Sequence, residues 1–416
     1  MPPLGLQYIA ANIKNKNHEV GILDQILNYD MMSPIGKTGV DICGISIDTW
    51  KQILTDFKPD VVGISCNFSY QHGALKHTLK IIKETNPEIK TIIGGNHVTA
   101  YYQKKFPPIP NADDYILGEA EEAFNDYLEG RLEKKFYQTK DLDSLAFPAR
   151  GNMQPYYDTN LQHHNINIPG NRVVVAITSR GCYRNCIFCS VKNVWGKGVR
   201  TRSPENVLKE IDEIVNVYKA TEIHFEDDNL LYDKQRCLKI FEGMRKYNIR
   251  WTCPNGVDIS KIDGEVLEAM QASGCSRITI CPESMSDRIL KFYRKPFNVK
   301  RIKEKVELIR KYPFELVGYF IVGAPDETMQ EAMDTIKYAV NEFDDSSMSV
   351  LAPYLGTDLY DYCEKNGLFL GDWLENEFIN MQADVVETFK RKNISANDML
   401  LLVQTYQFLK NNKLKL

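Results

Sequence analysis

Residues 179–190 read SRGCYRNCIFCS and place Cys182, Cys186 and Cys189 at CxxxCxxC spacing, directly after the β-branched run VVVAIT at 173–178. Thiolates are the usual ligands of iron–sulfur clusters and a four-iron cube takes four ligands, so three cysteines on one loop predict a cube with one iron open to a small molecule. The alternative is a zinc site or a buried cysteine cluster. Zinc sites take ligand pairs at two loci, and the sequence has no second CxxC and no HxxxH.

The segment that follows this loop alternates short β-branched runs with helical patterns, which is typical of βα units around a parallel sheet. Six runs predict strands: VVVAIT from Val173, EIHFEDD from Glu222, IRWTC from Ile249, RITICPE from Arg277, ELVGYFIVG from Glu315 and SMSVLAPY from Ser347. Ser203 and Pro204 predict the start of one intervening helix, and Asp326 is expected to cap another. We expect a β/α partial TIM barrel over residues 172–365.

The composition is that of an ordinary globular protein. Its 416 residues are 43% hydrophobic and 25% charged, which allows two or three domains with a large core. The 51 basic and 55 acidic residues are well mixed, and a net charge of −4 predicts neither a nucleic acid nor a membrane surface as partner. No apolar run reaches the roughly 18 residues that cross a bilayer and no signal peptide is evident, so a cytoplasmic protein is expected. The other cysteines are expected to be small buried residues: Cys43, Cys66, Cys237, Cys253, Cys275, Cys281 and Cys363.

Residues 1–125 show a separate βα alternation and predict a Rossmann-like α/β domain. The runs EVGILD (19–24), VVGIS (61–65), TIIGG (91–95) and DYILGE (114–119) are of the parallel-strand type. Gly94, Gly95 and Gly118 follow strands and leave room for a large ligand at the carboxyl edge of this sheet. No GxGxxG motif supports a nicotinamide cofactor.

Residues 126–171 and 366–416 flank the barrel. The first segment holds Pro148, Pro155, Pro169 and the pair His163–His164, and it predicts a linker that wraps the barrel, with the histidines on the surface. The second predicts a short, mostly helical tail. We expect its Trp373, Phe378 and Met381 to contact the substrate.

The cysteine spacing, with the aromatic Phe188 just before the third cysteine, resembles the radical S-adenosylmethionine (SAM) superfamily. The resemblance implies that Cys182, Cys186 and Cys189 bind a [4Fe–4S] cluster and that the amine and carboxylate of SAM chelate the open iron. The reduced cluster then breaks the S–C5′ bond and yields a 5′-deoxyadenosyl radical. In such chemistry the protein binds, orients and excludes water, while the cofactors supply the reactivity.

In barrels of this kind the reacting groups lie at the carboxyl ends of the strands. The second strand ends in HFEDDN where the family commonly has GGE, so Glu226, Asp227 or Asp228 is expected to accept the SAM ammonium, with Asp228 aligned best. The remaining positions that resemble family motifs are Asn255 after the third strand, Glu283 and Ser284 in CPESMS, and Ile321 and Gly323 in GYFIVGAP along which the adenine lies. Each carboxylate could instead cap the next helix, and the basic run Lys192, Lys197, Arg200 and Arg202 could be a solvated face.

The N-terminal region resembles the cobalamin-binding domain found ahead of many radical SAM enzymes. The matching stretches are PPLGLQYIAANI (2–13), KPDVVGIS (58–65), IIGGNHVTA (92–100) and ILGEAEEAF (116–124). The resemblance implies that the nucleotide tail of cobalamin is lined by Leu4, Ser65, Gly94, Gly95, His97, Gly118 and Glu119. There is no DxHxxG, so His97 is not expected to bind cobalt and a base-off state is expected. Family members usually have a further strand before PPLG, and this chain begins there, so we expect that the strand is lost, that the start is misplaced, or that another segment substitutes for it.

Together the two resemblances predict a cobalamin-dependent, class B-like radical SAM methyltransferase that methylates an unactivated carbon through the 5′-deoxyadenosyl radical and methylcobalamin. They imply a small-molecule or natural-product-type substrate and a reducing partner such as flavodoxin or ferredoxin. Two alternatives stay open: a radical SAM enzyme that catalyses a rearrangement, cyclisation or oxidation, and a non-catalytic iron–sulfur or zinc-binding sensor. Methylthio transfer is disfavoured, because the N-terminal domain lacks the three-cysteine set of a second cluster.

Overall fold

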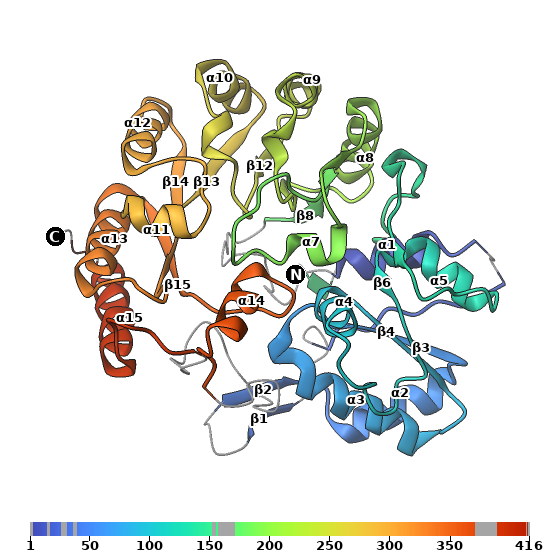
Figure 1. Ribbon diagram of the computed structural model, residues 1–416. Helices are drawn as coiled ribbons and strands as arrows, with labels where there is room; N and C mark the ends of the chain where they lie inside the picture. Colours follow the sequence, from blue (N-terminus) through green and yellow to red (C-terminus); the bar gives the residue numbers. More distant parts are fainter. Residues whose placement is uncertain are drawn as a thin grey trace.

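The computed structural model describes residues 3–14, 17–25, 31–35, 40–151, 155–156, 171–370, 389–412 and 414. Two α/β modules lie side by side, a larger one formed by the C-terminal half and a smaller one formed by the N-terminal third (Figure 1). The α/β class expected from the sequence, with a Rossmann-like module followed by a partial barrel, is confirmed.

The larger module is built on one six-stranded parallel sheet. Its order is β15-β14-β13-β12-β11-β8, so the strands follow one another in space as they do along the chain. The strands are β8 (Val173–Ala176), β11 (Glu222–Phe225), β12 (Arg250–Thr252), β13 (Cys275–Glu283), β14 (Glu315–Val322) and β15 (Asp345–Val350). All six predicted strands are confirmed, and the sheet stays open between β8 and β15 as a partial barrel does.

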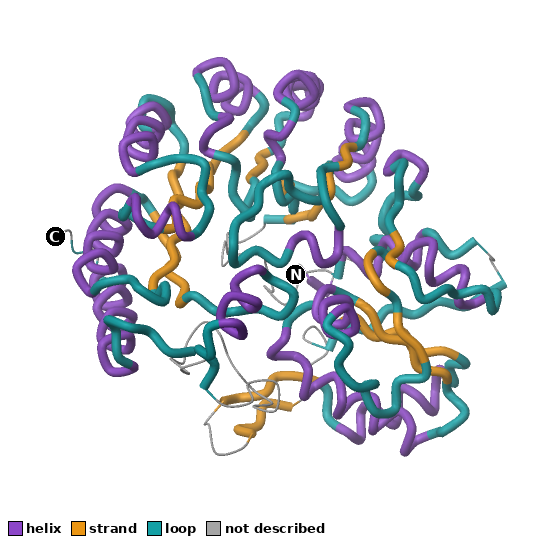
Figure 2. Tube along the Cα trace, viewed as in Figure 1, coloured by secondary structure: helices purple, strands orange, loops and turns teal. Residues whose placement is uncertain are grey.

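Helices cover the outer face of this sheet as an arc (Figure 2). They are α8 (Pro204–Asn216), α9 (Lys234–Met244), α10 (Gly264–Ala272), α12 (Val299–Ile309) and α13 (Met329–Glu342), while the short α11 (Asp287–Phe292) lies inside this arc (Figure 1). Ile223, Trp251 and Ile278 belong to the core between strands and helices, and each is at most 1% exposed. Because side chains alternate along a strand, the neighbouring positions face the inside of the barrel.

Helix starts follow the local capping chemistry. Ser203 caps α8 as predicted, since its hydroxyl accepts the Asn206 N–H at 3.1 Å. The prediction of Asp326 as the cap of α13 is wrong. The cap is Thr328, whose hydroxyl accepts the Glu331 N–H at 3.3 Å while the Glu331 carboxylate accepts the Thr328 N–H at 3.0 Å. This reciprocal capping box satisfies two N–H groups and so starts the helix two residues later.

The smaller module contains a three-stranded parallel sheet of order β3-β4-β5, with a parallel pair β6 and β7 beside it. Its strands are β3 (Val61–Ser65), β4 (Lys90–Gly94), β5 (Asp114–Tyr115), β6 (Leu117–Gly118) and β7 (Phe136–Tyr137). Its helices are α1 (Leu4–Ala11), α2 (Ile47–Phe57), α3 (His72–Thr85), α4 (Asn96–Gln103) and α5 (Ala120–Leu128). Three of the four strands predicted for this module are therefore confirmed.

The fourth prediction, a strand at EVGILD, is wrong. Residues 19–24 form no strand, and Val20 and Ile22 are 44% and 39% exposed. Among the described residues no strand pairs with this run, although β3 is paired on one side only, so a β-branched run does not by itself make a strand. An antiparallel hairpin of β1 (Met31–Ile35) and β2 (Val40–Gly44), which the sequence did not predict, follows instead.

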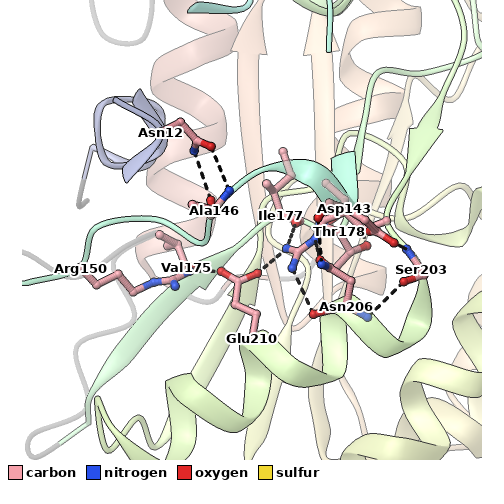
Figure 3. A network of polar contacts seen from close by, with 12 residues as sticks. Asn12, Asp143, Ala146, Arg150, Val175, Ile177, Thr178, Ser203, Asn206 and Glu210 are labelled. Carbon is pink, nitrogen blue, oxygen red and sulfur yellow. Dashed lines mark hydrogen bonds and ion pairs between the residues drawn. The ribbon is translucent and has the colours of Figure 1, made fainter. Parts of the chain in front are cut away.

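The segment predicted as a linker joins the modules through polar contacts (Figure 3). Asn12 in the smaller module accepts the Ala146 N–H at 2.9 Å and donates to its carbonyl at 3.3 Å. Arg150 donates to the Val175 carbonyl on β8 at 2.9 Å and pairs with Glu210 on α8 at 2.5 Å. Residues 141–150 thus fasten α1 to the first strand of the barrel. The predicted surface pair His163–His164 lies outside the described residues.

The C-terminal segment continues the barrel with α14 (Asp358–Lys365) and α15 (Ala396–Asn411). Tyr406 of α15 donates its hydroxyl proton to the Ser346 carbonyl on β15 at 2.5 Å. Trp373, Phe378 and Met381 lie outside the described residues. In the part of the chain that the structure describes, no helix combines the length and apolar character that crossing a membrane requires.

Candidate active site

The three cysteines lie on the loop between β9 (Ser179–Arg180) and α7 (Val191–Trp195), just beyond the carboxyl end of β8. Ile187, in the middle of the loop, is 4% exposed. Its N–H donates to the Tyr293 carbonyl at 3.3 Å, and its own carbonyl accepts the Leu359 N–H at 2.8 Å. The loop is therefore anchored to the end of α11 and to α14, and all three cysteines on it are half-buried.

The surroundings of the thiols suit cluster ligands. The Arg184 N–H and the Asn229 side-chain amide donate to the Cys182 sulfur at 3.5 and 3.6 Å. Burial raises the pKa of Cys189 to about 12 and also raises the pKa of Cys186. Cys186 and Cys189 therefore keep their protons until a cation displaces them, so loading with iron would release protons.

The thiol set differs from a single-ion site. Among the described ranges, no three His, Cys, Asp or Glu side chains converge on one point as the ligands of one metal ion do. The thiolates of a four-iron cube each bind a different iron, so the three sulfurs lie on one loop without converging on a single metal position. The CxxxCxxC loop and its N–H donors fit such a cube.

Asp227 and Asp228, at the end of β11, have different surroundings. Asp227 is fully buried, and its carboxylate accepts the Thr178 N–H at 3.0 Å, the Thr178 hydroxyl at 2.7 Å and the Ser179 hydroxyl at 2.5 Å. Both of its oxygens tie β11 to the end of β8. Asp228 accepts the Gly181 N–H at 3.2 Å, next to Cys182, and burial raises the pKa of Asp228 to about 7.

Two side-chain amides, of Asn229 after β11 and of Asn255 after β12, lie near the same site. Asn229 is 2% exposed, and its side-chain oxygen has no hydrogen-bond partner although its amide faces Cys182. A buried oxygen without a partner is costly unless a ligand donates to it. Asn255, which follows β12, donates to the Glu226 carbonyl and carboxylate at 3.0 and 3.2 Å, so two predicted site residues from neighbouring strands meet.

Glu283 ends β13 with a φ of +67°, a backbone conformation that costs free energy for a residue with a side chain. Its carboxylate pairs with Lys295 at 2.9 Å, and the two side chains are 8% and 11% exposed. Burial raises the pKa of Glu283, and the Glu283 carboxylate raises that of Lys295 despite burial. Burial raises the pKa of Cys186, and the charge of Lys295 partly offsets that rise, so Lys295 lies close enough to act on the cysteine loop. Sequence reasoning missed Lys295, since nothing in its local pattern marks it as buried.

Ser284 is fully buried and faces away from the loop. Its hydroxyl lies 3.4 Å from that of Thr335 on α13 and accepts the Ser286 N–H at 3.2 Å. In this arrangement Ser284 fixes the turn after β13, while Glu283 is the member of the pair directed toward the cysteines.

The residues expected along the adenine lie around Tyr293. The Phe188 ring meets Tyr293 edge-on at 5.3 Å, and the Tyr293 hydroxyl donates to the Ile321 carbonyl at 3.5 Å. Gly323 has a φ of +92°, and a Cβ there would lie 2.9 Å from the Arg391 guanidinium, which donates to the Gly323 carbonyl. The space at this glycine is thus occupied by Arg391 of the C-terminal segment.

The carboxyl edge of the smaller sheet carries most residues predicted for the corrinoid. Ser65 and Gly94 end β3 and β4 and are paired in register. Gly95 has a φ of +104°, and a Cβ there would lie 2.5 Å from the Cys66 carbonyl, so only glycine fits. Leu4 begins α1, which packs beside α5. At the same edge Phe68 and Tyr70 are stacked 5.2 Å apart and are 47% and 39% exposed, which is an apolar surface that suits a planar macrocycle.

His97 is 2% exposed and uses both ring nitrogens within the protein. Nε2 lies 3.0 Å from Nδ1 of His72, and Nδ1 lies 3.2 Å from the Ser69 hydroxyl. Burial, with a smaller contribution from His72, lowers the pKa of His97 to about 3, so the ring is neutral. A neutral ring engaged at both nitrogens joins the loops after β3 and β4. This geometry agrees with the expectation that His97 does not bind cobalt.

Gly118 and Glu119 serve the packing of the modules. A Cβ at Gly118 would lie 2.3 Å from the Tyr137 carbonyl, so this glycine allows β7 to approach. Glu119 is 3% exposed and pairs with Arg180 and with Arg200, each at 2.5 Å. Arg180 precedes Cys182 by two residues, so the acidic residue predicted at the corrinoid contacts the start of the cysteine loop. Sequence reasoning gave Arg180 no role.

Family comparisons cover both modules. Residues 1–128 match the B12 binding domain, and residues 176–339 match the Radical SAM superfamily. The cytidylyl-2-hydroxyethylphosphonate methyltransferase of Streptomyces wedmorensis is 29% identical in an alignment that covers 88% of this chain and 78% of that protein. An uncharacterized methyltransferase of Pyrococcus horikoshii is 30% identical over 388 residues, 89% of this chain and 80% of that protein.

Solved structures share the arrangement of modules. The radical S-adenosylmethionine methyltransferase TsrM from Kitasatospora setae, with tryptophan substrate and a SAM analogue bound, has a TM-score of 0.63 at 13% identity and covers 88% of this chain and 74% of its own. The cobalamin-dependent S-adenosylmethionine radical enzyme OxsB, with aqua-cobalamin and SAM bound, has a TM-score of 0.60 at 16% identity and covers 87% of this chain and 55% of its own. At these identities the likeness shows the fold.

Proposed function

This chain belongs to the radical SAM superfamily, in the branch that carries a B12-binding domain, and on that premise we propose that it methylates an unactivated carbon of a small-molecule substrate. The cofactors of this branch are a [4Fe–4S] cluster, SAM and cobalamin. When bound, they supply the electron, the adenosyl radical that takes hydrogen from the substrate, and the methyl group.

One observation carries the proposal: the cysteine loop and the carboxyl edge of the smaller sheet meet. Asn96, the first residue of α4 after β4, donates its side-chain amide to the Ser190 hydroxyl at 3.0 Å. Ser190 directly follows Cys189. A group held by the cysteines and a group held at this edge would be neighbours. Transfer of a methyl group between two bound cofactors requires such proximity.

Different residues around the cysteine loop would contact different parts of SAM. Cys182, Cys186 and Cys189 would bind three irons and leave the fourth for SAM. The Asp228 carboxylate and the buried Asn229 oxygen are the acceptors that face this loop, and they would receive the SAM ammonium. Phe188 and Ile321, held by Tyr293, would border the adenine, and Glu283 would reach the ribose or carboxylate side.

In the smaller module, Leu4, Ser65, Gly94, Gly95 and Gly118 would border the corrinoid and its tail. The stacked Phe68 and Tyr70 would lie against the macrocycle. His97 would hold the surrounding loops without binding the metal, because both of its ring nitrogens are engaged.

The inner face of the barrel is the proposed substrate site. Arg277, Thr279 and Cys281 alternate along β13 with Ile278 and Ile280, which pack under the outer helices. A lining of this polarity suits a small polar molecule. An external one-electron donor, such as flavodoxin or ferredoxin, would reduce the cluster.

The test uses anaerobically reconstituted protein loaded with cobalamin, reduced with dithionite, and given methyl-labelled SAM and a deproteinised cell extract. Methylation predicts deoxyadenosine together with label in a carbon-bound position of a small molecule. Deoxyadenosine formation without label in any product would favour a rearrangement, cyclisation or oxidation instead. A colourless zinc protein that leaves SAM intact would contradict the enzyme assignment altogether.

A further inference from the structure

We propose that Arg180 is a positioning residue that fixes the cysteine loop against the corrinoid edge of the smaller module, and so sets the approach of SAM to cobalt. The inference rests on the proposed function. Arg180 is the last residue of β9 and precedes Cys182 by two residues. Among the described residues, its side chain contacts carboxylates and aromatic rings and no thiol, so its effect would pass through the loop.

The Arg180 guanidinium contacts four side chains, which come from both modules. Arg180 is 3% exposed, and its two terminal nitrogens pair with Glu119 and Glu121, each at 2.5 Å. Its guanidinium carbon Cζ lies 5.2 Å from the centre of the Tyr8 ring and 4.9 Å from the centre of the Trp195 ring. Tyr8, Glu119 and Glu121 belong to the smaller module, whereas Trp195 ends α7 after the cysteine loop. The planar fork of arginine makes both ion pairs directional.

A second arginine makes Glu119 indispensable to this arrangement. Arg200 on β10 (Arg200–Thr201) is the register partner of Arg180 on β9, so two positive side chains occupy opposite positions on one ladder. Like charges directly opposite are unfavourable. Glu119 binds Arg180 with one carboxylate oxygen and Arg200 with the other, both at 2.5 Å. With Glu121, two carboxylates balance two guanidinium groups.

The other end of the cysteine loop is held by the same module. Asn96 donates to Ser190 at 3.0 Å, and the Asn96 N–H is itself held by the Asn67 side chain at 3.2 Å. Glu119 follows β6 and contacts the loop before its first cysteine, and Asn96 follows β4 and contacts the loop after its last cysteine. Both ends of the loop are therefore bound to the predicted corrinoid edge. In Figure 1, α7 lies where the two modules join.

These contacts fix the position of the cysteine loop more than they stabilise the fold. A buried ion pair adds little net stability compared with apolar packing, but its charged groups must keep a narrow range of positions relative to each other. Interfaces between domains usually allow relative motion unless they are large and apolar. A displacement of about 1 Å between reacting groups can cost about 100-fold in rate. The buried arginine cluster would prevent such a displacement at the point where the two cofactors meet.

The experiment compares Arg180→Lys, Glu119→Gln and Glu121→Gln with the wild type. Arg180→Lys keeps the charge and removes the planar fork, whereas Glu121→Gln breaks one of the two ion pairs and is the mild variant. Lys104→Met is the matched control, because Lys104 pairs with Asp361 across the same two modules on the surface, where these side chains are 28% and 60% exposed. Iron content and circular dichroism establish that each variant is folded and loaded.

Three readouts are taken with added cobalamin and labelled SAM: deoxyadenosine formed under dithionite, label transferred from the SAM methyl group to reduced cobalamin, and broadening of the cob(II)alamin EPR signal by the reduced cluster. We expect Arg180→Lys and Glu119→Gln to lower label transfer by about 10- to 100-fold and to change the broadening, with deoxyadenosine formation within about twofold of wild type. Glu121→Gln should show the same pattern to a smaller extent, and Lys104→Met should match the wild type.

Equal losses of label transfer and deoxyadenosine formation in a folded, iron-loaded variant would overturn the inference, because a merely structural role lowers both. Unchanged label transfer in all three variants would also overturn it while leaving the proposed function intact. If the wild type itself transfers no label to cobalamin, the proposed function fails and this inference fails with it.

Discussion

Replacing Lys295 by methionine should destabilise the barrel, because it leaves the buried Glu283 carboxylate without its partner. The charged atoms lie 2.9 Å apart, and the two side chains are 8% and 11% exposed. At an effective dielectric constant of about 20 the attraction is about 6 kcal/mol, and removing one member of a buried pair costs about 3–5 kcal/mol after desolvation is counted. That loss is roughly a third of the stability of a typical domain.

The assay is a double-mutant cycle of Lys295→Met, Glu283→Gln and the double variant, followed by urea unfolding with Trp251 fluorescence as the probe. Trp251 is fully buried beneath the outer helices, so it reports on the barrel. The double variant should recover most of the loss, since it leaves no buried charge. Lys295→Met should also lose stability as the pH rises, because burial raises the pKa of Glu283 above its unfolded value and deprotonation then disfavours the fold. A coupling free energy below about 0.5 kcal/mol would refute this reasoning.

Three further predictions concern the cysteines, Gly95 and Glu327. Alanine at Cys182, Cys186 or Cys189 should abolish SAM cleavage and lower iron content, and a variant that still forms deoxyadenosine would count against the ligand assignment. Gly95→Ala should cost more than about 1 kcal/mol in urea unfolding, because φ is +104° and the Cβ would lie 2.5 Å from the Cys66 carbonyl. The control Gly130→Ala, at φ +71° with no atom within 4 Å, should cost less, and equal losses would show that the contact is unimportant. Burial raises the pKa of Glu327 to about 7, so its deprotonation should destabilise the folded state. Between pH 4.5 and 7, the free energy of unfolding of the wild type should fall by about 3 kcal/mol relative to that of Glu327→Gln. Parallel pH profiles of the two proteins would contradict this.

The sequence predicted the sheet of the barrel well, because each strand carries a local pattern. Runs such as VVVAIT and ELVGYFIVG are buried on both faces and flanked by helices, and both became strands of the parallel sheet. EVGILD has a similar pattern but pairs with no strand in the part of the chain that the structure describes, and pairing is not visible in a local pattern. The cap of α13 was misplaced for a different reason: Asp326 and Thr328 are both good capping residues, and the return bond from Glu331 decides between them.

The candidate site was predictable where residue types follow strand ends, and not where partners come from distant segments. Asp228 and Glu283 lie beside the cysteine loop, as their positions after strands predicted. Glu119 and Arg180 are 61 residues apart in sequence, and Lys295 meets Glu283 only because the turn after α11 folds back. Sequence spacing carries no record of such contacts, so the ion pairs of Glu119 with Arg180 and Arg200 were not predicted.

The central claim is that one chain holds a three-cysteine iron cluster beside a corrinoid. Metal analysis and EPR on a single anaerobically reconstituted sample, with and without SAM, test it most directly. We predict about four irons and one cobalt per chain, a base-off cob(II)alamin signal, and a cluster signal that changes when SAM is added. Iron binding without cobalt would contradict the pairing of cofactors, and a cluster signal indifferent to SAM would contradict the open iron.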